Sequence, residues 1–159
     1  MTGATTEIGG GVDRDRPPTC GPEAAVFPLL SVIIPTLNEA EALPPLLADL
    51  RRQQGLTLEV IVGDGGSPDG TREVVEAAGA RFVAAQRGRG AQMNAAAAAA
   101  GSEWLLFLHA DSRLPAPDLL AGAVAALQRA AAATSRVAGH FSLRFLRTTA
   151  GRDLAYRYL

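Results

Sequence analysis

One stretch of this chain reads Trp104-Leu105-Leu106-Phe107-Leu108-His109-Ala110-Asp111. Its first part is apolar without a break and turn residues follow, a pattern that predicts a strand buried on both faces. Such strands belong to parallel sheets that helices cover, and ligands of these sheets bind at the carboxyl ends of the strands. Asp111 lies at that end, so its carboxylate is a candidate ligand for a hard cation such as Mg²⁺. The alternative is that Asp111 caps a turn.

The composition narrows the class of protein. The chain has 159 residues, which allows one domain with a sizeable core. Its net charge of -1 and its pI of about 6.1 give no reason to expect nucleic-acid binding. Cys20 is the single cysteine, so no disulfide forms within the chain and a reducing, cytoplasmic location is expected. No apolar run approaches the roughly 18 residues of a membrane span, and the residues before Val26 do not resemble a signal peptide.

The chain divides into a tail and a domain. Residues 1–28 are rich in Gly, Thr, Pro and charged residues. Such a segment buries too little apolar surface to offset its chain entropy, so it is predicted to be disordered. The ordered domain is expected over residues 29–159, incomplete at its C-terminal end.

Strand patterns and helix patterns alternate along the domain. The predicted strands are Leu29–Ile34, Leu58–Val62, Arg81–Ala85 and Trp104–His109, with a half-exposed strand over Arg136–Phe145. The predicted helices run from an Asn38 N-cap to Gly55, over Thr71–Ala78 before Gly79, over Ala91–Ala100, over Asp118–Ala132, and from Thr149 onward. This alternation predicts an α/β fold, a mainly parallel sheet with helices on both faces.

Polar clusters follow each of the first four predicted strands. They are Thr36-Leu37-Asn38-Glu39, Gly63–Asp69, Arg87-Gly88-Arg89-Gly90 and His109-Ala110-Asp111. Because the carboxyl ends of parallel strands meet at one edge of a sheet, the clusters are expected to lie together and to form a binding site.

Each cluster suggests a chemical role and a structural alternative. Asp64 is placed to accept hydrogen bonds from a base or ribose, or else to cap its glycine-rich turn, and Asp69 is predicted to cap a helix. Arg87 and Arg89 precede a helix, where guanidinium groups and free N–H groups suit a phosphate; alternatively they form a solvated basic loop. His109 could ligate a metal, bond a phosphate or be structural.

Two common nucleotide-binding motifs are not matched. The segment from Gly88 begins like a dinucleotide fingerprint, but Met93 stands where the last glycine belongs. There is also no P-loop lysine among the predicted site residues. A nucleotidyltransferase would need a basic, glycine-rich loop after the first strand, and Thr36-Leu37-Asn38-Glu39 is neither.

Taken together, these residues resemble the family 2 glycosyltransferases, which have a GT-A fold. The matching motifs are Ser31–Glu39, Glu59–Thr71 and Leu106–Asp111, within a resemblance that covers about Leu29 to Phe145. Arg87–Asn94 and the His-Ala-Asp form resemble a bacterial subgroup associated with radical-SAM or selenium-related domains or with arsenosugar synthesis. The family implies a nucleotide-diphospho-sugar donor and a divalent metal, Mg²⁺ or Mn²⁺.

The resemblance also implies roles for individual residues. Residues expected to line the nucleoside pocket or approach the donor are Pro35, Asn38, Glu39, Asp64, Gly66, Ser67, Arg87, Arg89, Gly90 and Asn94. Asp111 matches the last Asp of the family's Asp-x-Asp metal motif, and His109 stands where the first Asp usually does, so both are expected at the metal.

The expected reaction is inverting transfer of a sugar to an acceptor that the sequence does not identify. The catalytic base of the family lies well after the metal motif, and here it is expected beyond Leu159. An incomplete domain would transfer sugar poorly and self-associate through an open sheet edge. The alternative is a non-catalytic nucleotide-binding module, or a fragment completed by a partner chain.

Overall fold

The computed structural model describes residues 29–134 and 136–142. Its strands are β1 (Leu29–Thr36), β2 (Thr57–Asp64), β3 (Arg81–Ala84) and β4 (Trp104–Phe107). Its helices are α1 (Leu43–Arg51), α2 (Thr71–Ala77), α3 (Arg89–Ala98) and α4 (Leu119–Ala131). The strands form one sheet in the order β3-β2-β1-β4, and every pairing is parallel. The predicted α/β fold with a parallel sheet is confirmed.

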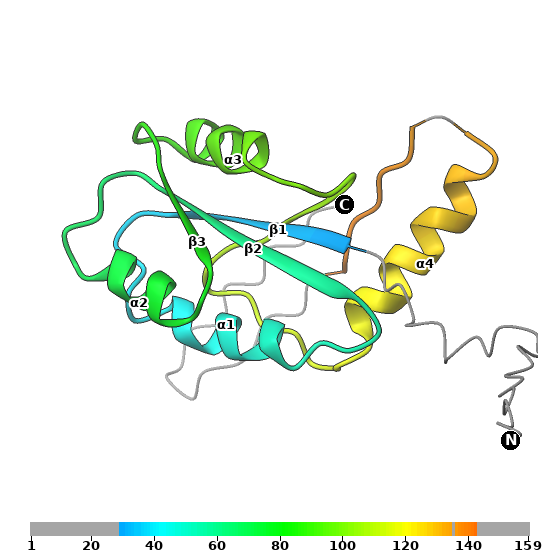
Figure 1. Ribbon diagram of the computed structural model, residues 1–159, viewed down its shortest axis with the longest axis horizontal. Helices are drawn as coiled ribbons and strands as arrows, with labels where there is room; N and C mark the ends of the chain where they lie inside the picture. The colour runs from blue at the N-terminus through cyan, green and yellow to red at the C-terminus, as the bar shows by residue number, and fades with distance from the viewer. Residues whose placement is uncertain (1–28, 135, 143–159) are drawn as a thin grey trace, which may run out of the picture.

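Helices cover both faces of this sheet (Figure 1). On one face, Val32 and Ile34 of β1 pack in a core with the leucines of α1, with Val75 of α2 and with Leu120 of α4. On the other face, Ile33 of β1 packs with Ile61 of β2 and with alanines of α3. Successive residues of a strand point to opposite faces, so the apolar run of β1 supplies both cores.

Helix α3 lies close to the sheet because both sides of the contact are small. A Cβ added at Gly63 of β2 would overlap the backbone carbonyl of Gln92 and would lie 3.2 Å from the Cβ of Ala96. Glycine in the strand and alanine in the helix therefore permit an approach that larger residues would prevent. The start of α3 is thereby held beside the end of β2.

The first helix begins later than predicted. Asn38 is not an N-cap: its φ is 59°, whereas an N-cap has an extended backbone. The first helical residue is Leu43, its N–H donates to the carbonyl of Glu39 at 2.9 Å, and Ala42 occupies the N-cap without a side-chain bond. Two prolines in the first turn supply the helical φ. The helix also ends at Arg51, before Gly55.

The expectation that the fourth strand is buried on both faces is wrong. β4 ends at Phe107 and, within the described residues, pairs only with β1. Leu105 is 41 % exposed and Phe107 is 49 % exposed, while Trp104 and Leu106 pack against the core. Burial alternates because helices of the described part cover only one side of this edge strand.

Other predicted boundaries agree in part. β1 and β2 both extend to the polar residues Thr36 and Asp64, and Gly79 follows α2 with a φ of 71°, as a C′ glycine does. Residues 136–142 form no strand, contrary to the prediction, and the rest of that predicted strand lies outside the described residues. So do the predicted tail and the helix predicted from Thr149. No helix of the described part has both the length and the hydropathy to span a membrane.

Candidate functional site

The carboxyl ends of β1 and β2 lie side by side. Thr36 and Asp64 are the last residues of the two strands and are partners in the parallel register. The Thr36 hydroxyl donates a hydrogen bond of 3.0 Å to Oδ1 of Asp64, and the N–H of Gly65 donates to the Thr36 carbonyl at 3.0 Å. The two strand-end loops therefore leave the sheet from one fixed point.

Asp64 is buried and holds the turn that follows it. Its Oδ2 accepts the N–H groups of Gly66 and Ser67, both at 2.8 Å, and its Oδ1 accepts the Ser67 hydroxyl at 2.5 Å. Gly66 sits in the turn with a φ of 87°, a conformation that favours glycine. Asp64 thus makes the cap contacts of the structural alternative, and its role toward a nucleoside stays a prediction.

The ionisation of Asp64 reflects two opposing effects. Burial raises the pKa of this carboxyl. Hydrogen bonds from Ser67, Gly66 and Thr36 lower the pKa by more than burial raises it, so that the net pKa lies below its ordinary value. Asp64 is therefore negatively charged at neutral pH. A buried charge of this kind persists because every oxygen has donors.

The loop after β1 is fastened to the loop after β2 through its backbone. The N–H of Asn38 donates to the Ser67 hydroxyl at 2.8 Å, and the N–H of Glu39 donates to Oγ1 of Thr71 at 3.1 Å. Asp69 accepts the N–H of Ala40 at 3.0 Å and also the N–H and hydroxyl of Thr71 at 3.1 and 2.6 Å. Asp69 therefore has a structural role at the start of α2 but is not its N-cap, because Gly70 occupies that position and makes no side-chain cap bond.

The predicted phosphate residues gather at the start of α3. Arg87, Arg89, Gly90 and Asn94 are all exposed, and Gly88 precedes the helix with a φ of 134°. Sequence reasoning missed Gln92, whose buried side chain donates from Nε2 to the Thr36 carbonyl at 2.5 Å. The available signal in the sequence was a polar amide in an alanine-rich helix, since such a group needs a hydrogen-bond partner when the helix packs on the sheet.

The turn after β4 carries the predicted metal residues. Leu108 continues the line of β4 by donating its N–H to the Ile33 carbonyl at 3.0 Å, and Ser112 donates to the His109 carbonyl at 3.1 Å. His109 and Asp111 are exposed, whereas Ala110 between them is buried in the core. The two side chains therefore project from one anchored turn.

Electrostatics place this turn near the loop after β1. The pKa of Glu39 is raised first by burial and then by the negative charges of Asp111 and Asp69, while His109 lowers it. Asp111, Asp69 and His109 therefore lie close enough to Glu39 to act on its charge. The structure thus brings the turn after β4 to the edge that carries the first two clusters, with Pro35 half-buried at the end of β1.

The side chains of Asp111 and His109 suit a divalent cation that is also bound by the phosphates of a nucleotide. In residues 29–134 and 136–142, no three His, Cys, Asp or Glu side chains converge as a complete metal site. Asp111 and His109 on one turn can supply an oxygen and a nitrogen. Mg²⁺ binds through one or two carboxylates together with phosphate oxygens and water, so the residues fit a metal bound with a diphosphate.

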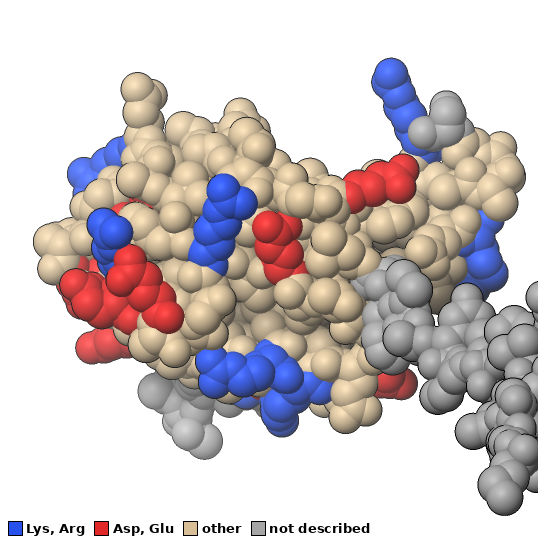
Figure 2. Space-filling view, viewed as in Figure 1, with Lys and Arg blue, Asp and Glu red and all other residues tan. Residues whose placement is uncertain are grey.

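The distribution of surface charge is consistent with a cation site at the same edge of the sheet. In the space-filling view, Asp and Glu side chains gather at the left end, near α2 and the carboxyl ends of β1 and β2 (Figure 2). Some of the Arg side chains visible on this face adjoin one another at its lower margin. The negative potential of such an edge attracts cations.

The fold and this edge define an α/β protein whose candidate site is built from strand-end loops. Residues 31–155 match Glycosyl transferase family 2, and the chain therefore belongs to this family. The chain is 38 % identical over 101 residues to a PGL/p-HBAD biosynthesis glycosyltransferase of Mycobacterium tuberculosis. The aligned region covers 59 % of this chain and 40 % of that relative.

Two solved structures share the fold. The mannosyltransferase PcManGT of Pyrobaculum calidifontis, in complex with GDP-Man and Mn²⁺, aligns with a TM-score of 0.56 and 30 % identity over 69 % of this chain and 35 % of that chain. S. aureus TarS in complex with UDP aligns with a TM-score of 0.54 and 27 % identity over 63 % of this chain and 32 % of that chain. The described sheet therefore has the predicted GT-A fold, and this chain spans less than half of each relative.

Proposed function

We propose that this chain binds a nucleotide-diphospho-sugar with a divalent cation and serves glycosyl transfer to an acceptor hydroxyl. The observation that carries the proposal is the convergence of the β1, β2 and β4 strand ends on one acidic edge, with two exposed arginines at the start of α3. GDP-Man with Mn²⁺ in PcManGT and UDP in TarS support the ligand class.

The charges suggest how the donor is held. A diphosphate would be repelled by Glu39, Asp69 and Asp111 alone, so a cation at Asp111 and His109 would bridge the acidic edge to the phosphates. The exposed guanidinium groups of Arg87 and Arg89, together with free N–H groups of α3, would bind other phosphate oxygens. Pro35, Asn38, Glu39, Asp64, Gly66 and Ser67 would face the nucleoside, and Gly90 and Asn94 the sugar side.

The bound metal would supply charge neutralisation for the departing diphosphate. Transfer with inversion also needs a base for the acceptor hydroxyl, and we assign no residue of this chain to that role. Arg87–Asn94 and the His-Ala-Asp sequence favour the bacterial subgroup associated with radical-SAM or selenium-related domains or arsenosugar synthesis.

Titration calorimetry with UDP, GDP and AMP, in Mn²⁺ or in EDTA, tests the proposal. We expect UDP or GDP to bind with Mn²⁺ and to lose most of that affinity in EDTA, whereas AMP, which lacks the diphosphate, gains little from the metal. Incubation with UDP-glucose and GDP-mannose then distinguishes the alternatives, because binding without transfer or donor hydrolysis supports a binding module. Absence of metal-dependent binding of both diphosphates would refute the proposal.

A further inference from the structure

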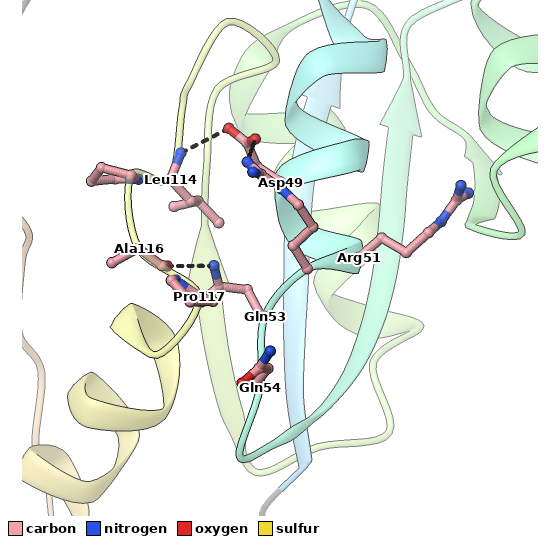
Figure 3. A pocket seen from close by; sticks show the side chains of 9 residues that line it. Asp49, Arg51, Gln53, Gln54, Leu114, Ala116 and Pro117 are labelled. Carbon is pink, nitrogen blue, oxygen red and sulfur yellow. Dashed lines mark hydrogen bonds and ion pairs between the residues drawn. The ribbon is translucent and has the colours of Figure 1, made fainter.

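A buried carboxylate lies outside the donor edge. Asp49, near the end of α1, is only 2 % exposed. Its Oδ2 accepts Nε of Arg113 at 2.6 Å and the backbone N–H of Leu114 at 3.1 Å, and its Oδ1 accepts Nη2 of Arg113 at 3.2 Å and a hydrogen bond from Arg52. Figure 3 shows Asp49 directed from α1 toward Leu114.

This carboxylate binds the segment that follows the predicted metal turn. Arg113 and Leu114 come directly after the turn that carries His109 and Asp111. A two-nitrogen contact between a guanidinium and a carboxylate fixes orientation as well as distance. Burying a charge is costly unless it is fully paired, so a well-paired Asp49 holds its partners in one geometry.

A second set of contacts holds the same segment farther along. Nε2 of Gln53 donates to the Ala116 carbonyl at 2.8 Å, as Figure 3 shows, and the N–H of Gln54 donates to the Pro117 carbonyl at 2.7 Å. Figure 3 shows a pocket between the end of α1 and residues 114–117, and the polar groups of Asp49 and Gln53 that line it are hydrogen-bonded within the chain. These groups hold residues 114–117 against α1 and are not left for a ligand.

The metal turn is therefore held from two sides. On the amino side, Leu108 is bonded to β1 and Ala110 is buried. On the carboxyl side, the first strong contact is the one from Asp49 to Arg113 and Leu114. Loss of that contact would leave Ala116 and Pro117 as the nearest hydrogen-bonded positions on the carboxyl side, farther from His109 and Asp111.

We infer that Asp49 and Arg113 are positioning residues that hold the turn of His109 and Asp111 in the geometry for a divalent cation. The inference rests on the proposed function and extends it, since neither residue touches the donor edge itself. The contact joins residues 64 positions apart, so it fixes the position of the turn of His109 and Asp111 relative to α1.

Arg113→Met tests this role, and Arg52→Met is the matched control. Both arginines bind Asp49, but Arg52 belongs to the end of α1 and does not lie on the turn. Calorimetry of Mn²⁺ in the presence of saturating UDP gives the metal affinity, and UDP binding in EDTA gives the metal-free affinity. We expect Arg113→Met to weaken Mn²⁺ about 10-fold, the lower end for groups that orient metal ligands, with metal-free UDP binding unchanged and Arg52→Met near the parent.

Hydrogen exchange supplies a readout that does not need a ligand. In Arg113→Met the amides of residues 109–114 should exchange faster than in the parent, while those of β1 and β2 keep their protection. Should Arg113→Met fail to fold, Arg113→Lys keeps the charge but loses the two-nitrogen contact, and the same loss of Mn²⁺ affinity is expected.

Three results would overturn the inference. One is a parent-like Mn²⁺ affinity in folded Arg113→Met or Arg113→Lys. Another is an equal loss in Arg52→Met, which would assign the effect to the general stability of α1. The third is a parent that binds neither UDP nor GDP with Mn²⁺, which overturns the proposed function and with it this role, and which the parent titration alone identifies.

Discussion

The hydroxyl of Thr36 and the carboxylate of Asp64 meet at 3.0 Å across the ends of two parallel strands. Their strands are paired in register at these residues, so the bond closes the sheet at the point where both loops depart. Gln92 reaches the carbonyl of the same Thr36 from α3. One residue at the end of β1 thus connects three of the elements that form the candidate site.

Asp64→Ala should destabilise the fold and weaken nucleotide binding. The change leaves donors from Thr36, Gly66 and Ser67 without their acceptor. Of these donors the Thr36 hydroxyl is buried, and an unsatisfied buried donor costs about 1–3 kcal/mol, so urea denaturation should show a loss of at least about that size. Thr36→Val, which removes one donor and keeps the carboxylate, should lose less. Parent stability in Asp64→Ala would contradict the capping contacts, and full UDP affinity in its folded fraction would contradict the nucleoside role.

Asp111→Asn should remove the metal-dependent part of nucleotide binding and leave the fold unchanged. Asp111 is exposed, and among the described residues its carboxylate accepts no hydrogen bond. Calorimetry with UDP in Mn²⁺ and in EDTA measures the difference. Glu103→Gln, which changes an exposed carboxylate at the opposite end of β4, is the control and should behave like the parent. An Asp111→Asn protein with the parent's dependence on Mn²⁺ would refute the assignment.

Gly63→Ala should destabilise the protein by displacing α3. The added methyl would overlap the Gln92 carbonyl, and overpacking of this kind costs about 1–3 kcal/mol. Gly122→Ala, in α4 with open space around it, should instead stabilise by about 0.5–1 kcal/mol because alanine favours helix. Thermal unfolding of both variants checks the pair. Equal melting temperatures would show that α3 does not pack closely on β2.

Asp49 should make stability depend on acid pH. Hydrogen bonds from Arg113 lower the pKa of this carboxyl most, burial opposes them, and bonds from Leu114 and Arg52 lower it further, to well below its usual range. A folded pKa below the unfolded value of about 3.9 means that the unfolded chain binds the proton first. The stabilisation is therefore complete above about pH 5 and declines as the pH falls through 4 and below.

Urea denaturation of the parent and of Asp49→Asn between pH 6 and pH 2 measures this effect. The free energy of unfolding of the parent should fall more steeply below pH 4, by up to about 1.4 kcal/mol per pH unit from this one group. Asp49→Asn should be less stable at pH 6 and should converge on the parent in acid. Parallel curves across the whole range would show that Asp49 does not contribute its charge to stability.

The sequence by itself determined the class of fold. Apolar strand patterns alternate with helical patterns, and prolines and glycines divide them, so local chemistry was enough to predict a parallel sheet and the edge where the polar clusters meet. It also placed polar residues next to the ends of β1, β2 and β4, although β1 and β2 run two residues past the predicted ends at Ile34 and Val62 and β4 ends at Phe107, before the predicted His109. These are features of neighbouring residues, which a linear pattern contains.

The tertiary structure decided what depends on distant partners. β4 alternates in burial because one of its sides lacks a cover in the described part, and Asn38 adopts a φ of 59° with its N–H on Ser67, a residue of another loop. Asp64 accepts the hydroxyl of Thr36 from the neighbouring strand, and Asp49 binds Arg113 across 64 positions. No local pattern contains such contacts, because they exist only after the chain has brought separate elements together and the buried charges have found their donors.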